Sequence, residues 1–349
     1  MLRVLDSTNR NEWNDIVKSF KNWDIYFLWE YANSFFIHGD GQAYLFYYEN
    51  NNDRLCFVGT KKDLYNNPKF EHKFEKGKYY DLDTPYGYGG VLLDNDISKD
   101  SQIDFKNQFD KYCLENKIVS VFFRYHPLLN NFGKLDCFED QFIHDTIYID
   151  TTSEEIINTN LDSKNRNVIR KAIKNDVEIV IKPISEYQDF IGLYNGTMKK
   201  LNASYYYIFK DEYYKSLGEL KDNANIFYAY YDGKPIAASI MLFNEQYMHY
   251  HLSGSDIEYR SLPATNLLLF EAAKWASNRG IKKFHLGGGL SADDSLFGFK
   301  KQFNKNDRVK FYLGKYIANK EAYDYLVNLR KELDPSFDVN NTNLIQYRK

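Results

Sequence analysis

The sequence predicts an α/β protein with mixed sheets, built from two halves that repeat one order of elements. Runs rich in β-branched and aromatic residues alternate with segments that have helical spacing. The order of two helices, a hairpin, a further strand, a helix and a final strand begins near residue 9 and begins again near residue 185. Each half is then about 150 residues long, an ordinary domain size.

In the first half, residues 9–37 predict two short helices, because Trp13 is followed by apolar residues three, four and seven positions later. The runs 43–49 and 54–60 predict a hairpin, since turn-forming Asn and Asp residues separate them. The next elements are expected at 102–116 (helix) and 118–125 (strand).

The second half repeats this order. Its elements are expected at 189–201 and 211–220 (helices), 225–243 (a hairpin turning at Asp232-Gly233), 246–254 (strand), 264–280 (helix) and 282–288 (strand). Between the halves, residues 153–175 predict one polar, basic helix. We therefore expect domains at 1–152 and 153–335, packed around a shared cleft, and a frayed tail at 336–349.

The composition excludes several classes of protein. The chain has 349 residues, of which 44% are hydrophobic and 17% aromatic, and only seven are proline, so it is globular rather than disordered. A net charge of −3 provides no global field for nucleic acid. Cys56, Cys113 and Cys137 lie far apart without CxxC spacing, which argues against a disulfide framework and against a zinc site.

No segment has the apolar length of a signal peptide or of a membrane span. We therefore expect a cytoplasmic protein, with the inner face of the membrane as a second possible location.

Four segments together resemble the FemABX and related GNAT-like families. They are SKNRNVIRKAIKNDVEIVI (163–181), GKPIAASIMLF (233–243), YRSLPATNLLLFEAAKWA (259–276) and LFGFKKQF (296–303). The resemblance covers roughly residues 80–315. It implies two tandem GNAT-like domains that transfer an acyl or aminoacyl group from acyl-CoA or aminoacyl-tRNA to an amine. The implied acceptor is a nucleotide- or lipid-linked precursor of the cell wall or of a surface glycan.

Two departures from the family pattern narrow this expectation. The region 206–226 has no room for the helical arm that some members carry, so the chain resembles an arm-less member. Peptidoglycan-specific members tend to have a stretch with Thr and Arg after the methionine of the second helix. This chain reads MKKLNASYYY (198–207) there, which argues against a standard peptidoglycan acceptor.

Lys300 occupies the position of the family's FKxxF lysine, which implies a catalytic role. On a helix, the apolar stripe of Leu296, Phe299 and Phe303 places Lys300 beside a buried seam, whereas Lys301 faces solvent. A fixed cation there would stabilise an acyl oxyanion or hold a donor phosphate. The alternative is a lysine that snorkels at the edge of the helix.

A basic ridge is expected on the linking helix. Arg166, Arg170 and Lys174 are spaced four residues apart, next to an apolar face that includes Ile169 and Ile173. The ridge would bind phosphates of a nucleotide-linked glycan or of a tRNA end. The equally weighted alternative is an ordinary solvated face of an amphipathic helix.

Two loops offer further substrate-binding candidates. Tyr86 and Tyr88, in the loop 83–90, would orient an acceptor, or the loop is simply an elaborate turn. The segment before the helix at 264–280 lacks the glycines of a CoA pyrophosphate cradle, and its proline has no N–H. Arg260 and the backbone amides of 264–266, including Asn266, remain able to meet a phosphate.

The glycines at 287–289 mark a strand end where the backbone comes close to another group, without the spacing of a dinucleotide motif. No carboxylate stands out as a general base, although Asp81, Asp83 and Asp256 lie near the candidate loops.

His249, His251 and His285 fall on adjacent expected strands. We favour hydrogen-bonded core histidines over a metal site, and we expect neither a metal nor a permanently bound cofactor. A noncatalytic protein that binds a glycan or a nucleotide sugar on the same fold is the alternative to an enzyme.

Overall fold

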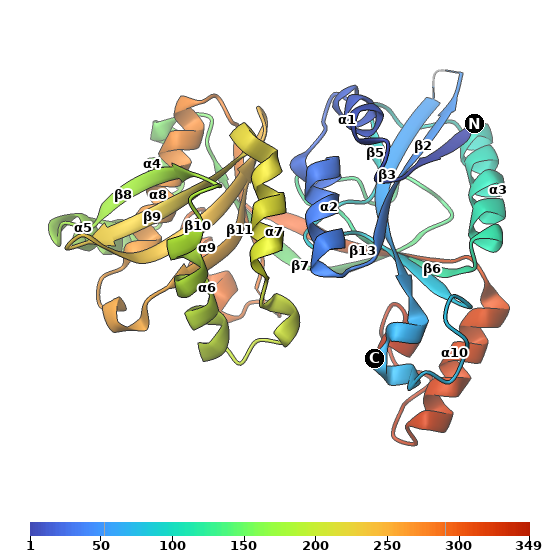
Figure 1. Cartoon of the computed structure of the whole chain (residues 1–349). Coiled ribbons are helices and arrows are strands. Elements are labelled where there is room, and N and C mark those ends of the chain that lie inside the picture. Colours follow the sequence, from blue (N-terminus) through green and yellow to red (C-terminus); the bar gives the residue numbers. More distant parts are fainter. Residues whose placement is uncertain (52, 290) are drawn as a thin grey trace. The chain divides into compact units, whose positions relative to one another are not determined.

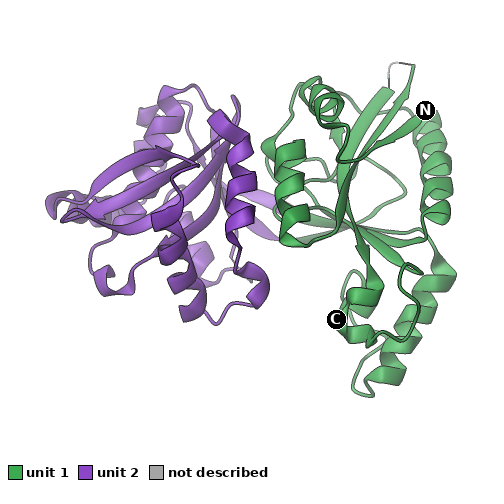
Figure 2. Cartoon of the chain, viewed as in Figure 1, with its two compact units in different colours: residues 1–143, 311–349 green, residues 144–310 purple. Residues whose placement is uncertain are grey.

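The computed structural model describes residues 1–51, 53–289 and 291–349. The chain forms two compact units: unit 1 contains residues 1–143 and 311–349, and unit 2 contains residues 144–310 (Figures 1 and 2). Each unit has a mixed sheet with helices packed on it, so the predicted α/β class is confirmed. Within the described residues, no helix combines the length and apolar character that a transmembrane span requires.

The sheet of unit 1 has the strand order β1-β2-β3-β4-β6-β13, and β5 pairs with β3. All neighbours are antiparallel except β4 and β6, which are parallel. The strands are β1 (Leu2–Leu5), β2 (Gln42–Asn50), β3 (Asp53–Asp63), β4 (Tyr80–Asp83), β5 (Leu92–Leu93), β6 (Ile118–Arg124) and β13 (Val309–Ile317); the α-helices are α1 (Arg10–Lys18), α2 (Trp29–His38), α3 (Lys99–Glu115) and α10 (Lys320–Leu333).

The sheet of unit 2 has the order β7-β12-β11-β10-β9-β8, with β11 and β12 as its parallel pair. Its strands are β7 (Glu139–Asp150), β8 (Glu178–Pro183), β9 (Ala224–Tyr231), β10 (Lys234–Phe243), β11 (Tyr247–Ser255) and β12 (Lys283–Gly287); its α-helices are α4 (Glu154–Asn160), α5 (Ser163–Lys174), α6 (Gln188–Lys200), α7 (Asp211–Leu217), α8 (Ala264–Asn278) and α9 (Ser295–Lys301).

The two units repeat one topology, as the sequence predicts. Reading each sheet from β1 or from β8, three antiparallel pairs are followed by one parallel pair and then by one antiparallel pair. A helix connects the two parallel strands in each unit, α3 in unit 1 and α8 in unit 2. The hairpin at Asp232-Gly233 is also confirmed: both residues have positive φ, which a tight two-residue turn requires. The predicted turn after β2 includes Asn52, which lies outside the described residues.

Each sheet is completed by a strand from a distant part of the sequence. β13 pairs with β6 from Leu313↔Arg124 to Ile317↔Ser120 and so brings the C-terminal residues into unit 1. Conversely, β7 lies at the end of the predicted first domain, 1–152, and pairs with β12 in unit 2. The observed units therefore differ from the predicted domains 1–152 and 153–335, because strand pairing over long sequence separations leaves no local signal.

The tail predicted at 336–349 is ordered rather than frayed. Tyr347 is fully buried, and its hydroxyl donates a hydrogen bond to Asp81 at 2.5 Å. The Arg348 guanidinium donates to Asp81 at 2.6 and 2.9 Å and to Asp83 at 2.6 Å. These buried carboxylates need a cation, and the C-terminal segment supplies it.

The linking segment also differs from its prediction. It forms two helices, α4 and α5, separated by Leu161 in an extended conformation. Asp162 begins α5, because its side chain accepts a hydrogen bond from the Lys164 N–H at 2.7 Å. On the expected apolar face Ile169 is buried, whereas Ile173 is 53% exposed.

We expect Arg348→Ala to lower the free energy of unfolding by about 3 kcal/mol, because it removes the cation that pairs with buried Asp81 and leaves Asp83 with Lys62, at 3.4 Å. Urea denaturation at pH 7 measures this loss. Arg3→Ala is the control: it breaks an exposed ion pair with Glu12, and it should cost less than about 1 kcal/mol. Equal losses in the two variants would contradict the role of Arg348.

Candidate functional site

A cavity of about 310 Å³ lies at the N-terminal end of α8 in unit 2. Its walls come from the end of β11, the segment between β11 and α8, the first turn of α8, and single residues of α6, β10 and α9. The lining residues are Lys200, Ile236, Ser255, Asp256, Ile257, Tyr259, Arg260, Leu262, Pro263, Ala264, Thr265, Asn266 and Phe299. This volume is within the usual range of small-molecule sites.

The charged groups of the cavity favour an anion. Within the described residues, neither Lys200 nor Arg260 pairs with a carboxylate. Asp256 is already neutralised, because its carboxylate lies 2.9 Å from Lys234 Nζ and this hydrogen bond lowers the pKa of Asp256. The cavity therefore retains two unbalanced cations.

The backbone at the start of α8 offers few donors to such an anion. Pro263 has no N–H, and the Ala264 N–H donates to the Leu262 carbonyl at 2.8 Å. The Asn266 N–H donates to the Pro263 carbonyl at 3.2 Å. Among the backbone groups described in this turn, the Thr265 N–H is left without an acceptor. Side-chain cations rather than a row of N–H groups thus supply the positive charge.

Lys300 lies on α9 and is buried, with 7% of its surface exposed. Its Nζ donates a hydrogen bond to the Gly288 carbonyl at 2.7 Å and lies 5.9 Å from the centre of the Tyr250 ring. Burial removes the ammonium from water and lowers the pKa of Lys300 to about 8, while the nearby carboxylate of Asp294 acts in the opposite direction.

The predicted orientation of α9 requires a correction. Phe297 and Lys300 face the core, whereas Leu296 is 39% exposed, so Lys300 does not lie at the helix edge and does not snorkel. Lys301 is exposed, as predicted. The sequence offers apolar residues at both 296 and 297, and the structure buries the larger of the two.

The glycines after β12 allow close packing around Lys300. A Cβ at Gly288 would lie 2.4 Å from Cε1 of His144, and a Cβ at Gly289 would lie 2.1 Å from Oδ1 of Asp294. The close approach expected at 287–289 is thus to side chains of unit 2. Asp294 in turn caps α9 by accepting from the Phe297 N–H at 2.8 Å.

Two of the three histidines on the unit 2 strands are hydrogen-bonded to side-chain hydroxyls. His285 Nε2 lies 2.9 Å from the Thr146 hydroxyl, and His251 Nε2 lies 2.9 Å from the Tyr213 hydroxyl. Burial lowers the pKa of His251 to about 3, so this imidazole is neutral at pH 7. His249 is buried in the same sheet.

Of the three residues of the basic ridge, one holds neighbouring backbone and two are exposed. The Arg166 guanidinium donates to the Asn158 carbonyl at the end of α4 at 2.9 Å. Arg170 and Lys174 are exposed. Asn266 does not point freely into the cavity, since its amide donates to the buried Asn165 side chain of α5 at 2.8 Å and so joins α8 to the start of this helix.

Tyr86 and Tyr88 belong to unit 1, where aromatic packing holds their loop. The Tyr31 hydroxyl donates to the Tyr86 carbonyl at 2.6 Å, and the Tyr88 ring packs edge-on against Tyr26 at 5.6 Å. Burial raises the pKa of Tyr88, so its phenol stays protonated. The loop is a rigid element with half-buried tyrosines.

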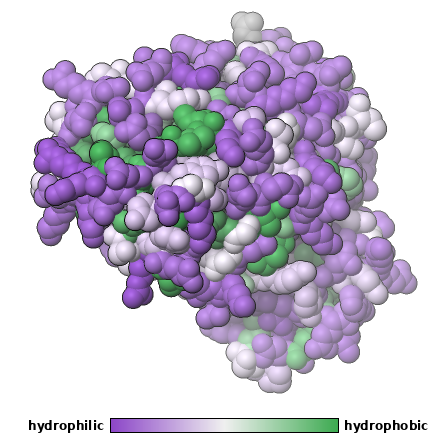
Figure 3. Space-filling view, turned by 60° about the vertical axis from the view of Figure 1, so that its left-hand side comes forward, coloured by the Kyte–Doolittle hydropathy of each residue, from purple (hydrophilic) through white to green (hydrophobic). Residues whose placement is uncertain are grey.

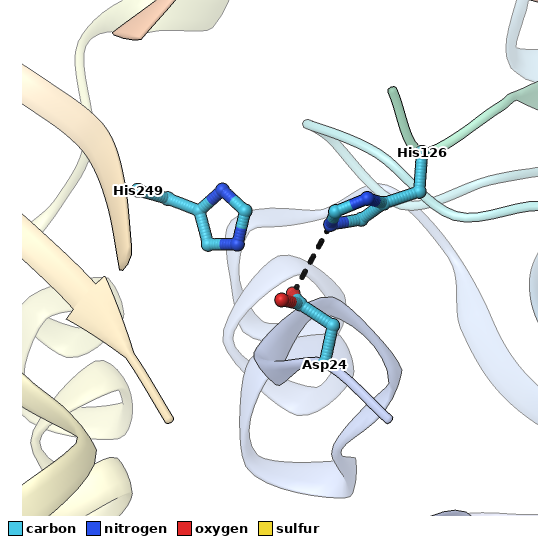
Figure 4. A group of neighbouring side chains, drawn as sticks. All are labelled: Asp24, His126 and His249. Carbon is cyan, nitrogen blue, oxygen red and sulfur yellow. Dashed lines mark ion pairs between the residues drawn. The ribbon is translucent and has the colours of Figure 1, made fainter. Parts of the chain in front are cut away.

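A buried polar pair supports this loop. His126 Nε2 lies 3.5 Å from an Asp24 carboxylate oxygen, and both side chains are fully buried. Figure 4 marks this pair with a dashed line. The His126 backbone N–H donates to the Gly89 carbonyl at 3.1 Å. By contrast, Asp81 and Asp83 are held by Arg348, which removes them as candidate general bases.

Comparison with known protein families finds a match within the second unit. Residues 163–301 match the family model described as an acetyltransferase (GNAT) domain. Residues 163–301 are therefore similar to a GNAT acetyltransferase domain, a likeness that supports acyltransferase activity. The GNAT domain contains the cavity, Lys300 and the basic ridge, and it implies acyl-CoA as a co-substrate.

Solved structures show the same tandem fold over nearly the whole chain. FemX aligns with a TM-score of 0.68 at 13% identity, over 93% of this chain and 99% of FemX. The C-terminal domain of a putative lysylphosphatidylglycerol synthetase from Agrobacterium fabrum aligns with a TM-score of 0.56 at 11% identity, over 90% and 93%. L-PGS from Bacillus licheniformis aligns with a TM-score of 0.52 at 10% identity, over 93% and 96%. No curated protein sequence matches the chain. The GNAT-type, FemABX-like fold is confirmed.

The site also contains groups that sequence reasoning missed. Lys200 and Thr265 line the cavity, and Tyr250 packs near Lys300. The two lysines at 199 and 200 close α6 and were visible as charges. Nothing in the sequence indicates that Lys200 meets Arg260, sixty residues later, because that proximity is created by the fold.

We expect Lys300→Met to stabilise the folded state more at pH 7 than at pH 10. The folded-state pKa of Lys300, about 8, is below its ordinary value of 10.5, so the unfolded chain binds the proton more tightly. Holding the ammonium in the folded state therefore lowers the free energy of unfolding. This loss is present in full below pH 8 and disappears as pH rises through 10.5. The free-energy difference between variant and wild type should therefore shrink by about 2 kcal/mol from pH 7 to pH 10.

Urea unfolding at both pH values measures this change. Lys301→Met, on the exposed face of the same helix, is the control and should show no such pH dependence. A constant difference for Lys300→Met would show that its ammonium is not held in a dry environment.

Proposed function

We propose that this acyltransferase moves an acyl or aminoacyl group from an activated donor to an amine of a cell-wall or surface-glycan precursor. The cationic cavity at the start of α8, in the same GNAT domain as the buried ammonium of Lys300, carries the proposal. A donor bears phosphates, and acyl transfer generates an oxyanion, so both positive groups have a chemical use.

The proposed donor is an acyl-CoA. Arg260, Lys200 and the Thr265 N–H line one cavity and would hold the pyrophosphate. Helix N-termini favour anions, and here two side-chain cations replace the missing glycine amides. Asn266 would act indirectly, by fixing the first turn of α8 against α5.

An aminoacyl-tRNA is the second candidate donor, and one observation favours it. Arg170 and Lys174 are exposed on α5 without a carboxylate partner in the described part of the chain, and Arg166 begins the same ridge. Such a ridge suits the phosphates of a tRNA acceptor end.

The reaction we propose is direct attack. The nitrogen lone pair of the acceptor amine forms a bond to the donor carbonyl, and the bond to the CoA sulfur or to the tRNA ribose oxygen breaks. The amine nitrogen loses one proton to water, and the departing sulfur or oxygen takes up one proton from water, so the donor leaves as a thiol or an alcohol. Lys300 would stabilise the transient oxyanion, and no covalent enzyme intermediate forms.

The proposal that the acceptor is a cell-wall or surface-glycan precursor rests on the likeness to FemX and on the family resemblance of the sequence. Tyr86 and Tyr88 remain proposed acceptor-binding residues, since aromatic faces suit sugar rings and their loop is rigid. We propose a cytoplasmic location, where acyl-CoA and nucleotide-linked precursors are both present. The GNAT match favours catalysis over a noncatalytic glycan-binding role.

We expect CoA to bind the wild-type protein in calorimetry and to bind Arg260→Ala about tenfold more weakly, because a charged hydrogen bond to phosphate is lost. Arg279→Ala is the matched control: Arg279 follows the opposite end of α8 and stacks on Trp275 at 4.3 Å. Absence of CoA binding, together with binding of a charged tRNA, would overturn the acyl-CoA assignment and support the second donor.

We expect Lys300→Met to lower the rate of acyl transfer about 100-fold without loss of secondary structure, since one oxyanion donor is removed. The measurement is release of thiol from acetyl-CoA in the presence of amino-sugar acceptors, with circular dichroism as the folding check. Lys301→Met should keep the wild-type rate. A wild-type rate in Lys300→Met would exclude Lys300 from catalysis.

A further inference from the structure

The segment after α6 exposes apolar side chains among lysines. Leu201 is 63% exposed and Tyr205 is 81% exposed. Figure 3 shows that the face drawn there is mostly polar, with apolar side chains in separate patches. Leu201 and Tyr205 lie only four residues apart on the connection between α6 and α7, which places two large exposed side chains on one short segment.

The charges around this connection have one predominant sign. Lys199 and Lys200 end α6, and Lys210 precedes α7. In the part of the chain that the structure describes, none of these three lysines forms an ion pair. Two acidic residues follow the connection at the start of α7. Asp211 already pairs with Lys215, at 2.7 Å, so Glu212 is the one whose charge counteracts the lysines.

The connection is held in shape by its own backbone. The Ala203 N–H donates to the Met198 carbonyl at 3.0 Å, and Asn202 adopts the left-handed conformation that ends α6. The Tyr207 N–H then donates to the Ser204 carbonyl at 2.9 Å. Leu201 and Tyr205 are thus presented on an ordered turn, which reduces the entropy lost on binding.

We propose that residues 199–210 dock this protein on the surface of a bilayer that contains anionic lipid. Tyrosine is favoured at the headgroup level, an exposed leucine gains free energy in the acyl region, and lysines are attracted to anionic headgroups. A site for stacking a base or a sugar ring would use Tyr205 but would leave Leu201 exposed.

Docking would also serve the reaction. Lys200 lines the anion cavity and directly precedes Leu201, so the docked segment holds this cavity close to the bilayer surface. This step rests on the proposed function and selects its lipid-linked acceptors over its soluble, nucleotide-linked ones. The docking itself is independent of the reaction.

The test is sedimentation with vesicles of phosphatidylcholine and phosphatidylglycerol at 7:3, and with vesicles of phosphatidylcholine alone. We expect the wild-type protein to bind the anionic vesicles, and Leu201→Ser/Tyr205→Ser to bind them at least about tenfold more weakly. Lys199→Gln should bind anionic vesicles about fivefold more weakly, since each lysine near the surface contributes about 1 kcal/mol.

The matched control is Ile103→Ser/Leu114→Ser on α3, which removes two apolar side chains that are 60% and 71% exposed. It should bind vesicles as the wild type does. CoA titration of Leu201→Ser/Tyr205→Ser should be unchanged, which separates loss of docking from failure of the proposed function. The proposal is overturned if the wild-type protein does not sediment with anionic vesicles, if the double variant binds them like the wild type, or if both double variants lose binding equally.

Discussion

The parallel pair of β11 and β12 organises the GNAT domain. These strands are in register over only three residue pairs, from Tyr247↔Lys283 to His249↔His285. Directly after β12, the Gly288 carbonyl accepts a hydrogen bond from Lys300 Nζ. The last residue of β11, Ser255, lines the cavity at the start of α8. The ends of the two parallel strands thus lie beside the buried cation and beside the cavity, respectively.

The candidate site combines one buried cation, Lys300, with two exposed cations, Lys200 and Arg260. Lys300 is buried and gives up part of its affinity for a proton, so its charge costs stability and acts strongly on a neighbouring oxyanion. Arg260 and Lys200 are exposed and line the cavity at the start of α8. In the reaction that we propose, the buried cation would act on the reacting carbonyl, and the exposed cations would hold a donor that must bind and leave.

Unit 1 depends on the end of the chain. β13 completes its sheet, and Arg348 pairs with the buried carboxylates of Asp81 and Asp83, the second of which also pairs with Lys62. The matched region ends at residue 301, and residues 311–349 return to build the other unit. Loss of this C-terminal segment would remove both a strand and a buried counter-charge from unit 1.

The sequence by itself determined the repeated order of elements, the two hairpins and the long helices, because each rests on local periodicity or on turn residues such as Asp232-Gly233. It also singled out Lys300 and Arg260 through a family resemblance. Only the tertiary structure decided that Lys300 is buried, that Lys200 joins Arg260 in one cavity, and that Arg348 meets Asp81. The physical reason is that burial and charge pairing depend on contacts between residues far apart in the chain, and the exchange of β7 and β13 creates those contacts without leaving a local pattern.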